Sequence, residues 1–244
     1  MTTQLKISLG ATAAVVLAII VIIAVRRPDE RNGGEHQTAG AARTRGEASL
    51  LRELDLQAEA AFKQFNELER SSPGGTNHQV FDKINEAFNE LGHKAGTGDE
   101  KAFQTLVEAA GMKYLQGPAT VGLGVAAGDG SEKAVEILVE PKKNDLLLSS
   151  VVGALRPAAE KGDTKAIKFL SGVTQDGSAR ALWFMAASAL AKPAGAGNEE
   201  AITGLINLLG VESKGVQQQV KTGLKQAALI GNARAQAAVD KMGW

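Results

Sequence analysis

The sequence predicts an all-α protein, a right-handed α-solenoid of antiparallel two-helix repeats preceded by a single transmembrane helix. Two observations lead to this prediction. From residue 98 onward, a phrase of the form Gly-(Asp/Ser/Asn)-x-x-Ala-x-x-x-aliphatic occurs five times in the 244-residue chain. Near the N-terminus, residues 7–25 form a stretch of 19 residues without a charge.

The uncharged stretch, ISLGATAAVVLAIIVIIAV, spans about 28 Å as a helix, which is close to the hydrocarbon thickness of a bilayer. It is longer than the core of a cleaved signal peptide and ends in Ala24-Val25-Arg26-Arg27, which is a poor cleavage site. Residues 1–27 are therefore predicted to be a retained membrane anchor. Its small residues Gly10, Ala14 and Ala18 form a stripe that either packs against another membrane helix or simply faces lipid.

Basic residues flank the anchor unequally. Lys6 precedes it, whereas Arg26, Arg27 and Arg31 follow it. The positive-inside rule therefore favours a cytoplasmic over a periplasmic position for the C-terminal body. The composition leads us to expect a single-pass protein of a bacterial inner membrane.

Residues 28–48 are rich in glycine and charge and show no hydrophobic period, which is typical of a flexible tether. Residues 49–97 are predicted to form a helical hairpin, a divergent first repeat. Its second helix places Val80, Ile84, Ala87 and Leu91 on one face. The first helix carries an apolar seam that favours this hairpin over a free coiled-coil dimer; the seam consists of Leu51, Leu54, Ala58, Ala61, Phe65 and Leu68.

The repeated phrase divides residues 98–244 into units. Repeats start at Gly98, Gly130, Gly162 and Gly197, and a capping helix starts at Gly231. Alanine stands four positions after each glycine and an aliphatic residue eight positions after it. Seven positions before the glycines stand Leu91, Leu123, Leu155, Leu190 and Leu224.

Each column has a physical reason. Glycine accepts the left-handed conformation that ends a helix, and the Asp, Ser or Asn after it can cap the next helix. Alanine and an aliphatic residue four positions apart share one helical face. Each unit is therefore helix A, a loop, helix B and a tight turn. Pro157 and Pro193 lie near the ends of B helices, where we expect a kink or an early helix end.

The junction AA-x-x-G-(D/N/S)-x-x-A resembles that of Sel1-like repeats, which are related to tetratricopeptide repeats, and residues 172–187 are similar to their middle segment. The alanine pair is displaced before Gly197, however, and the tetratricopeptide consensus is missing. The looser aliphatic pattern over residues 49–244 is more similar to HEAT-like or armadillo-like repeats. The resemblance implies a helical scaffold, and such scaffolds serve many functions.

No catalytic, cofactor or metal site is predicted. Lys and Arg balance Asp and Glu at 27 each, cysteine is absent, and the three histidines share no metal-ligand spacing. The glycines of 122–130 follow no strand and lack the Lys-Ser/Thr of a phosphate-binding loop. Cations and aromatic residues do not alternate, which argues against nucleic acid as a partner. We therefore expect no enzyme activity and no small-molecule substrate.

The remaining candidate is a binding surface. The loops between helices A and B are expected to lie on one rim of the solenoid. The predicted partner-binding residues on this rim are Tyr114, Lys142, Lys143, Gln175, Asp176, Glu212 and Lys214. Trp183 and Phe184 are adjacent on a B helix, so one of them is expected to be exposed as an anchor, and Trp183 joins the predicted set.

The sequence thus predicts a membrane-anchored helical-repeat scaffold that binds a protein partner, itself membrane-associated, near the bilayer and without catalysis. The alternative is a permanent accessory subunit of a membrane protein complex, held through Gly10, Ala14 and Ala18 of its transmembrane helix.

Overall fold

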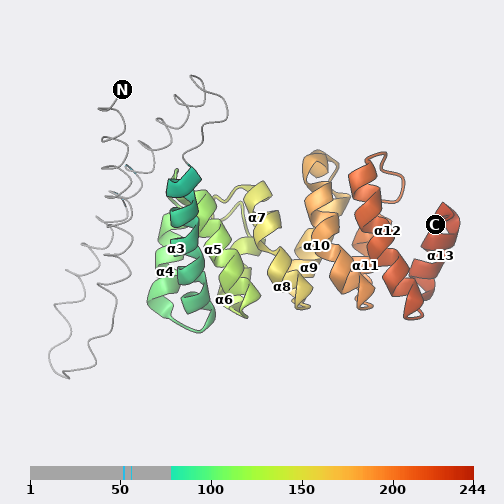
Figure 1. Ribbon diagram of the computed structural model, residues 1–244, viewed down its shortest axis with the longest axis horizontal. Coiled ribbons are helices and arrows are strands. Elements are labelled where there is room, and N and C mark those ends of the chain that lie inside the picture. The colour runs from blue at the N-terminus through green and yellow to red at the C-terminus, as the bar shows by residue number, and fades with distance from the viewer. Residues whose placement is uncertain (1–51, 53–55, 57–77) are drawn as a thin grey trace, which may run out of the picture.

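A computed structural model describes Arg52, Leu56 and residues 78–244 of the chain. All elements in this part are helices and none is a strand, which confirms the all-α prediction (Figure 1). The helices are α3 (His78–Gly96), α4 (Glu100–Ala110), α5 (Gln116–Gly128), α6 (Glu132–Val139), α7 (Leu148–Ala154), α8 (Arg156–Glu160), α9 (Thr164–Gln175), the 3-10 helix η1 (Gly177–Leu182), α10 (Trp183–Gly195), α11 (Glu199–Ile206), α12 (Lys214–Leu229) and α13 (Ala233–Met242).

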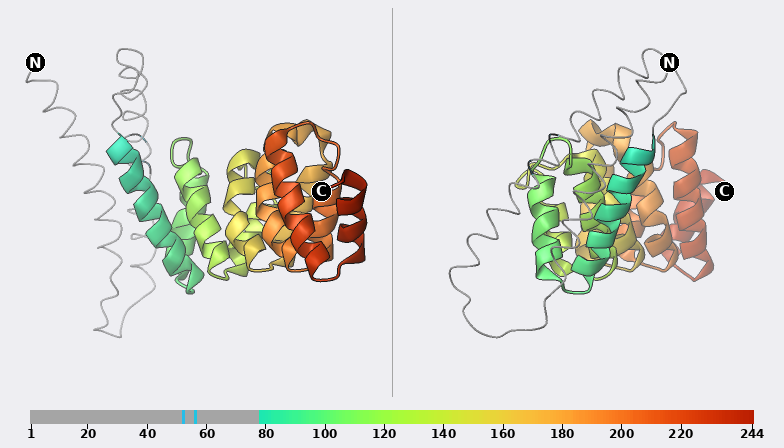
Figure 2. Two further views of the ribbon diagram at one scale, coloured as in Figure 1. Left: turned by 45° about the vertical axis from the view of Figure 1, so that its right-hand side comes forward. Right: turned by 60° about the vertical axis from the view of Figure 1, so that its left-hand side comes forward.

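The helices form two rows that run along the long axis in chain order (Figures 1 and 2). One row, the B row, consists of α3, α5, α7 with α8, α10 and α12, and each member contacts the next. The other, the A row, consists of α4, α6, α9, α11 and α13. From α5 onward, each member of the B row also packs on the A helices before and after it, as α5 does on α4 and α6, and α3 packs on α4. The apolar core therefore lies between the rows along the whole described stack.

Several predictions concern residues outside the described part. These are the anchor at 7–25, its stripe Gly10, Ala14 and Ala18, the tether at 28–48 and the first helix of the hairpin. The predicted second helix of the hairpin corresponds to α3. Among the helices that the structure describes, none is long and apolar enough to cross a bilayer.

The five glycines that begin the repeated phrase have the predicted left-handed backbone. The φ angles of Gly98, Gly130, Gly162, Gly197 and Gly231 are 99°, 104°, 92°, 89° and 90°. The residue after each glycine caps the next helix. Its side-chain oxygen accepts a hydrogen bond from the backbone N–H of the alanine three residues later. Both predictions are confirmed. Any other residue at these positions would need a backbone conformation that residues with a β-carbon rarely adopt.

The alanine and aliphatic columns form the core. The five alanines (Ala102, Ala134, Ala166, Ala201, Ala235) and the aliphatics (Leu106, Leu138, Leu170, Leu205, Val239) are all buried, as are Leu91, Leu123, Leu155, Leu190 and Leu224. Burying a leucine side chain stabilises the fold by about 1.5–3 kcal/mol. The periodic columns therefore mark the residues that hold the rows together.

Glycines inside the helices let the B row pack backbone to backbone. A β-carbon on Gly92 would lie 2.4 Å from the carbonyl oxygen of Gly122, and one on Gly124 would lie 2.6 Å from that of Ala154. One on Gly223 would lie 3.0 Å from the Cα of Ala191. These glycines are outside the repeated phrase, and their role was not predicted from the sequence. They set how closely neighbouring B helices approach.

The two prolines behave differently from each other. The B helix of the second unit breaks at Leu155, and Pro157 lies in the first turn of α8, where its missing N–H costs no hydrogen bond. The predicted kink is therefore present, but Ala158 and Ala159 are helical rather than a loose turn. The expectation for Pro193 is wrong, because α10 continues through it to Gly195. Pro193 has no N–H, so α10 continues through it without the backbone hydrogen bond that this position would otherwise donate.

Candidate partner-binding surface

The loops that lead from A helices to B helices lie together at one edge of the described stack, opposite the glycine turns (Figure 1). We call this the A–B edge. It consists of residues 111–115, 140–147, 176–182 and 207–213 and of the first residue of α12. Six of the predicted partner-binding residues are exposed on it or directly beside it: Lys142, Lys143, Gln175, Asp176, Glu212 and Lys214. Tyr114 is half-buried, and the Lys113 ammonium lies 5.2 Å from the centroid of its ring.

Two of these loops interact with neighbouring units. The Gln116 amide donates a 2.7 Å hydrogen bond to the backbone oxygen of Asp145. Hydrogen bonds from the side chain and backbone of Ser178 lower the pKa of Asp176, and the positive charge of Lys142 lowers it further. Lys142 and Asp176 therefore lie close enough to interact, although they come from different units. Lys143 instead pairs with Glu140 in its own loop at 2.8 Å.

The structure decides between the two adjacent aromatic residues. Trp183 is half-buried, and its indole N–H lies 3.2 Å from the carbonyl oxygen of Val173 and 3.3 Å from that of Asp176. Phe184 is 48% exposed. The exposed aromatic side chain is thus Phe184, whereas Trp183 ties α10 to the end of α9. Periodicity could have indicated this, because Trp183 is seven residues before the core position Leu190.

The solvent-facing side of the B row, here called the B face, is nearly free of charge in its middle. Helices α5 and α7 contain no charged residue, and α10 contains only Lys192. Helix α8 carries Arg156 and Glu160, which pair with each other at 2.6 Å. Large apolar side chains are exposed there or at its border with the A–B edge: Val121, Leu147, Phe184 and Met185. The sequence analysis did not identify this surface, because it depends on three helices that are far apart in the chain.

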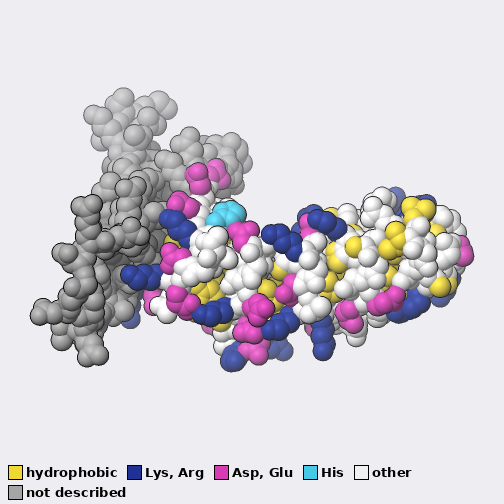
Figure 3. All heavy atoms as spheres, turned by 90° about the horizontal axis from the view of Figure 1, so that it is seen from below, with side chains coloured by type: hydrophobic (Ala, Val, Ile, Leu, Met, Phe, Trp, Pro, Cys, Tyr) yellow, Lys and Arg dark blue, Asp and Glu magenta, His cyan; other side chains and the backbone are white. Residues whose placement is uncertain are grey.

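The A row, by contrast, is covered by ion pairs between successive units. Lys133 pairs with Glu100 at 2.6 Å, and Lys165 pairs with Glu136 at 2.7 Å. Arg234 pairs with Glu199 at 3.0 Å. Figure 3 shows cations and anions side by side along one side of the stack. Each exposed pair contributes at most about 1 kcal/mol, so these pairs add only modestly to stability.

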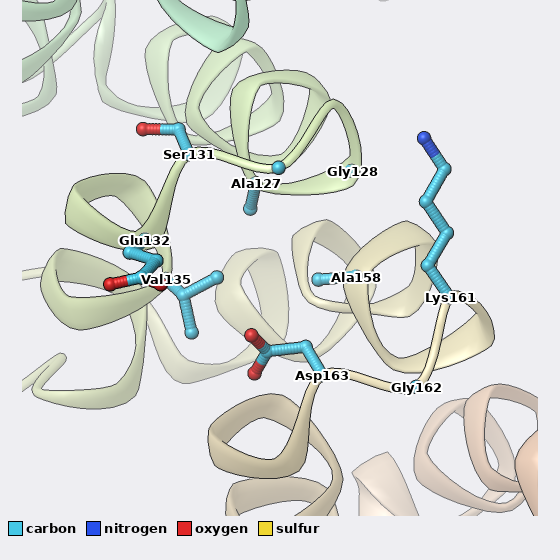
Figure 4. Close-up of a pocket in the computed structure, with 10 residues that line it drawn as sticks. Ala127, Gly128, Ser131, Glu132, Val135, Ala158, Lys161, Gly162 and Asp163 are labelled. Atoms are coloured by element: carbon cyan, nitrogen blue, oxygen red, sulfur yellow. The ribbon is translucent and has the colours of Figure 1, made fainter.

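A pocket of about 280 Å³ lies between two successive glycine turns, those of Gly130 and Gly162 (Figure 4). Its polar groups are already engaged. The Ser131 hydroxyl and the Asp163 carboxylate cap α6 and α9. The Lys161 side chain extends away from Glu132 and towards solvent, with its ammonium 3.8 Å from Asp129. The pocket therefore has no converging free groups that would bind a small molecule.

A cluster of charges beside this pocket makes stability depend on pH. The hydrogen bond from Arg156, at 2.6 Å, lowers the pKa of Glu160 below its ordinary value of 4.5. Partial burial opposes this shift, whereas the charges of Arg156 and Lys192 add to it. Because the folded-state pKa is the lower one, the stabilisation is present above the unfolded-state pKa and is lost as the pH falls through the folded-state pKa.

We therefore expect Glu160→Gln to destabilise the protein by a few tenths to about 1 kcal/mol near neutral pH. The difference from the wild type should shrink as the pH falls through the folded-state pKa of Glu160. Urea unfolding followed by tryptophan fluorescence over a series of pH values from neutral into acid measures this, with the exposed Glu212→Gln as the control. A destabilisation that persists in acid would contradict the electrostatic explanation.

The described residues contain no group of three or more histidine, aspartate or glutamate side chains placed to hold a metal ion. The nearest approach of a histidine to a carboxylate among them is the 2.6 Å contact between His93 Nδ1 and Asp129, a pair that links α3 to the turn after α5. Comparison of the chain with models of known protein families, with characterised proteins and with solved structures found no significant match.

Proposed function

We propose that the protein is a membrane-anchored, right-handed α-solenoid that binds a protein partner near the bilayer through its A–B edge, without catalysis. The observation that carries this proposal is that consecutive loops present exposed side chains on one edge: Lys142 with Lys143, Gln175 with Asp176, and Glu212 with Lys214. The repeated glycine turns at the opposite edge hold these loops at regular intervals. A row of loops on a rigid stack is a common basis for selective binding.

The solenoid interpretation is supported by the identical turn at every junction and by the contact of each B helix with the next. One such unit cannot bury its own apolar face, so neighbouring units must stack. The aliphatic two-helix units are consistent with HEAT-like repeats.

The anchor and tether predicted for residues 1–48 support a partner at the membrane. A flexible chain of 21 residues has a root-mean-square span of roughly 25 Å. The body would then meet membrane-associated partners at a local concentration far above that in free solution. A bacterial inner membrane with the body on the cytoplasmic side agrees with the arginines at 26, 27 and 31.

The second candidate is a permanent accessory subunit of a membrane complex. It is favoured by one observation, the stripe of Gly10, Ala14 and Ala18 in the apolar stretch. Replacing these three residues with isoleucine should then release the chain from its complex, while changes at the A–B edge should not.

The test uses the full chain in its native membranes. Proteins recovered with it after mild cross-linking are compared for the wild type, for the double variant Lys142→Glu, Lys143→Glu, and for Lys168→Glu, an exposed lysine of the A row. A partner that binds the A–B edge should be lost about tenfold with the double variant and retained with the control. Equal recovery with all three chains would overturn the proposal.

A further inference from the structure

We propose that the B face binds a second copy of this chain, with the two-fold axis parallel to the B helices and passing beside α7. Such an arrangement places α3 of one copy opposite α12 of the other, and α5 opposite α10. The helix α7 then faces its own counterpart. Three properties of the B row agree with this pairing.

The first property is charge. At the start of α3, Asp82 and Glu86 are exposed and form no ion pair with another described residue, while Glu90 is paired with Lys94. At the other end of the row, α12 carries Lys214, Lys221 and Lys225 and no acidic residue. None of these three lysines pairs with a carboxylate among the described residues, and Lys214 is the exposed one. The Lys221 ammonium lies 5.9 Å from the centroid of the Trp244 ring. The two-fold axis brings the acidic end of one copy to the basic end of the other, twice in each dimer.

The second property is side-chain size. Residues that stand 13 positions before the glycine of the next turn occupy equivalent places on successive B helices. These residues are Gly117, Ser149, Phe184 and Gln218. A β-carbon on Gly117 would have no other atom within 4 Å, so the space above α5 is open. On α10 the equivalent place holds the exposed Phe184, followed by Met185. The axis places Phe184 opposite the open surface at Gly117 and the exposed Val121, while the Met185 methyl group lies beside Gly153 of its own chain.

The third property is the centre of symmetry. Helix α7, which faces itself across the axis, has no charge and exposes the small residues Ser149 and Gly153. A charge at this place would meet its own copy and repel it. Helix α7 thus meets the condition that an isologous contact imposes on its axis, and the two charges of the adjoining α8, Arg156 and Glu160, pair with each other.

These properties favour a second copy over a foreign partner. On this one surface, acidic side chains lie on one side of α7 and basic ones on the other, and small and large side chains are divided in the same way. A contact with a foreign protein does not require such a symmetric arrangement. The ion pairs of the A row stay in water in such a dimer, and most of the A–B edge stays accessible. The two surfaces share Lys214, so changes at Lys142 and Lys143 test partner binding separately from self-association.

The chain lacks cysteine, so single-cysteine variants report directly on which surfaces meet. In native membranes, full-length Ser149→Cys should be cross-linked to itself by a short bis-maleimide reagent. The matched control Lys168→Cys, exposed on the A row, should be cross-linked at least about tenfold less. Two outcomes would overturn the proposal. One is equal cross-linking of both variants, which random collisions in the membrane would cause, and the other is cross-linking of neither variant.

Two further variants test the pairing of helices. When Gly117→Cys and Phe184→Cys chains carrying different tags are expressed together, the mixed cross-link should exceed both self cross-links. Glu86→Lys should reduce the Ser149→Cys cross-link about tenfold, and adding Lys214→Glu should restore it, because the double exchange recreates the opposite charges. Misfolded variants would not regain the cross-link, so its recovery in the double exchange would support the pairing of α3 with α12. If the cross-link is not recovered, the assigned orientation is wrong.

Discussion

Replacing Gly124 with alanine is expected to destabilise the protein by about 1–3 kcal/mol, although alanine is normally the better helix former. The added β-carbon would lie 2.6 Å from the Ala154 carbonyl oxygen and 2.8 Å from the Cα and Cβ atoms of the same residue. These atoms belong to the backbone and core of α7, so α5 and α7 must move apart. That movement also weakens the packing of the apolar side chains between them.

Gly172→Ala is the matched control, because it makes the same change within another helix of the stack. Gly172 lies inside α9, it is exposed, and a β-carbon there would meet no other atom within 4 Å. This variant should therefore be more stable than the wild type by about 0.5–1 kcal/mol. Urea unfolding of the full chain in mild detergent measures both variants, since the two tryptophans, Trp183 and Trp244, lie in the helical body. Changes of the same sign in the two variants would contradict the packing described for the B row.

Leu190→Ala should have the largest effect, a loss of about 2–5 kcal/mol. Leu190 is fully buried in α10, and its Cδ1 atom lies 2.8 Å from the position that a β-carbon on Gly204 would take. The leucine therefore fills the space that the missing side chain of Gly204 leaves in α11. Truncation removes apolar contact and opens a cavity that two rigid helices cannot close.

The matched control for this variant is Leu229→Ala. Leu229 belongs to the last turn of α12 and is 86% exposed, so its truncation should change the free energy of unfolding by no more than about 0.5 kcal/mol. The same unfolding experiment compares the two leucines. Similar losses for Leu190→Ala and Leu229→Ala would show that α10 does not pack as described.

The turns and core columns were predictable from the sequence because they depend on local rules. A glycine in the left-handed conformation, a cap residue after it and an alanine three residues after that cap act within a single turn. The buried leucines follow from helical periodicity in the same way. Gly162, Asp163 and Ala166 show all three features, and the same pattern at Gly197 was recognised despite the displaced alanine pair before it.

The candidate surfaces were predictable only in part. The loop residues of the A–B edge were identified from the alternation of helices, yet Trp183 was selected although Phe184 is the exposed one. The uncharged B face was missed, because its residues are neighbours in space and lie more than 25 positions apart in the chain. Pro193 was expected to kink its helix or end it early, but α10 continues through it to Gly195.

The sequence by itself determined that the described chain is helical, where each unit begins and which leucines and alanines are buried, since hydrogen bonding in a turn and the period of a helix are local properties. Only the tertiary structure decided how closely the B helices approach, which of two adjacent aromatic residues meets solvent and which face is free of charge. These properties depend on the contact between helices. Gly124 illustrates the difference: within α5 it is a weak helix former, and only its approach to the backbone of Ala154 shows why a larger residue would destabilise the protein.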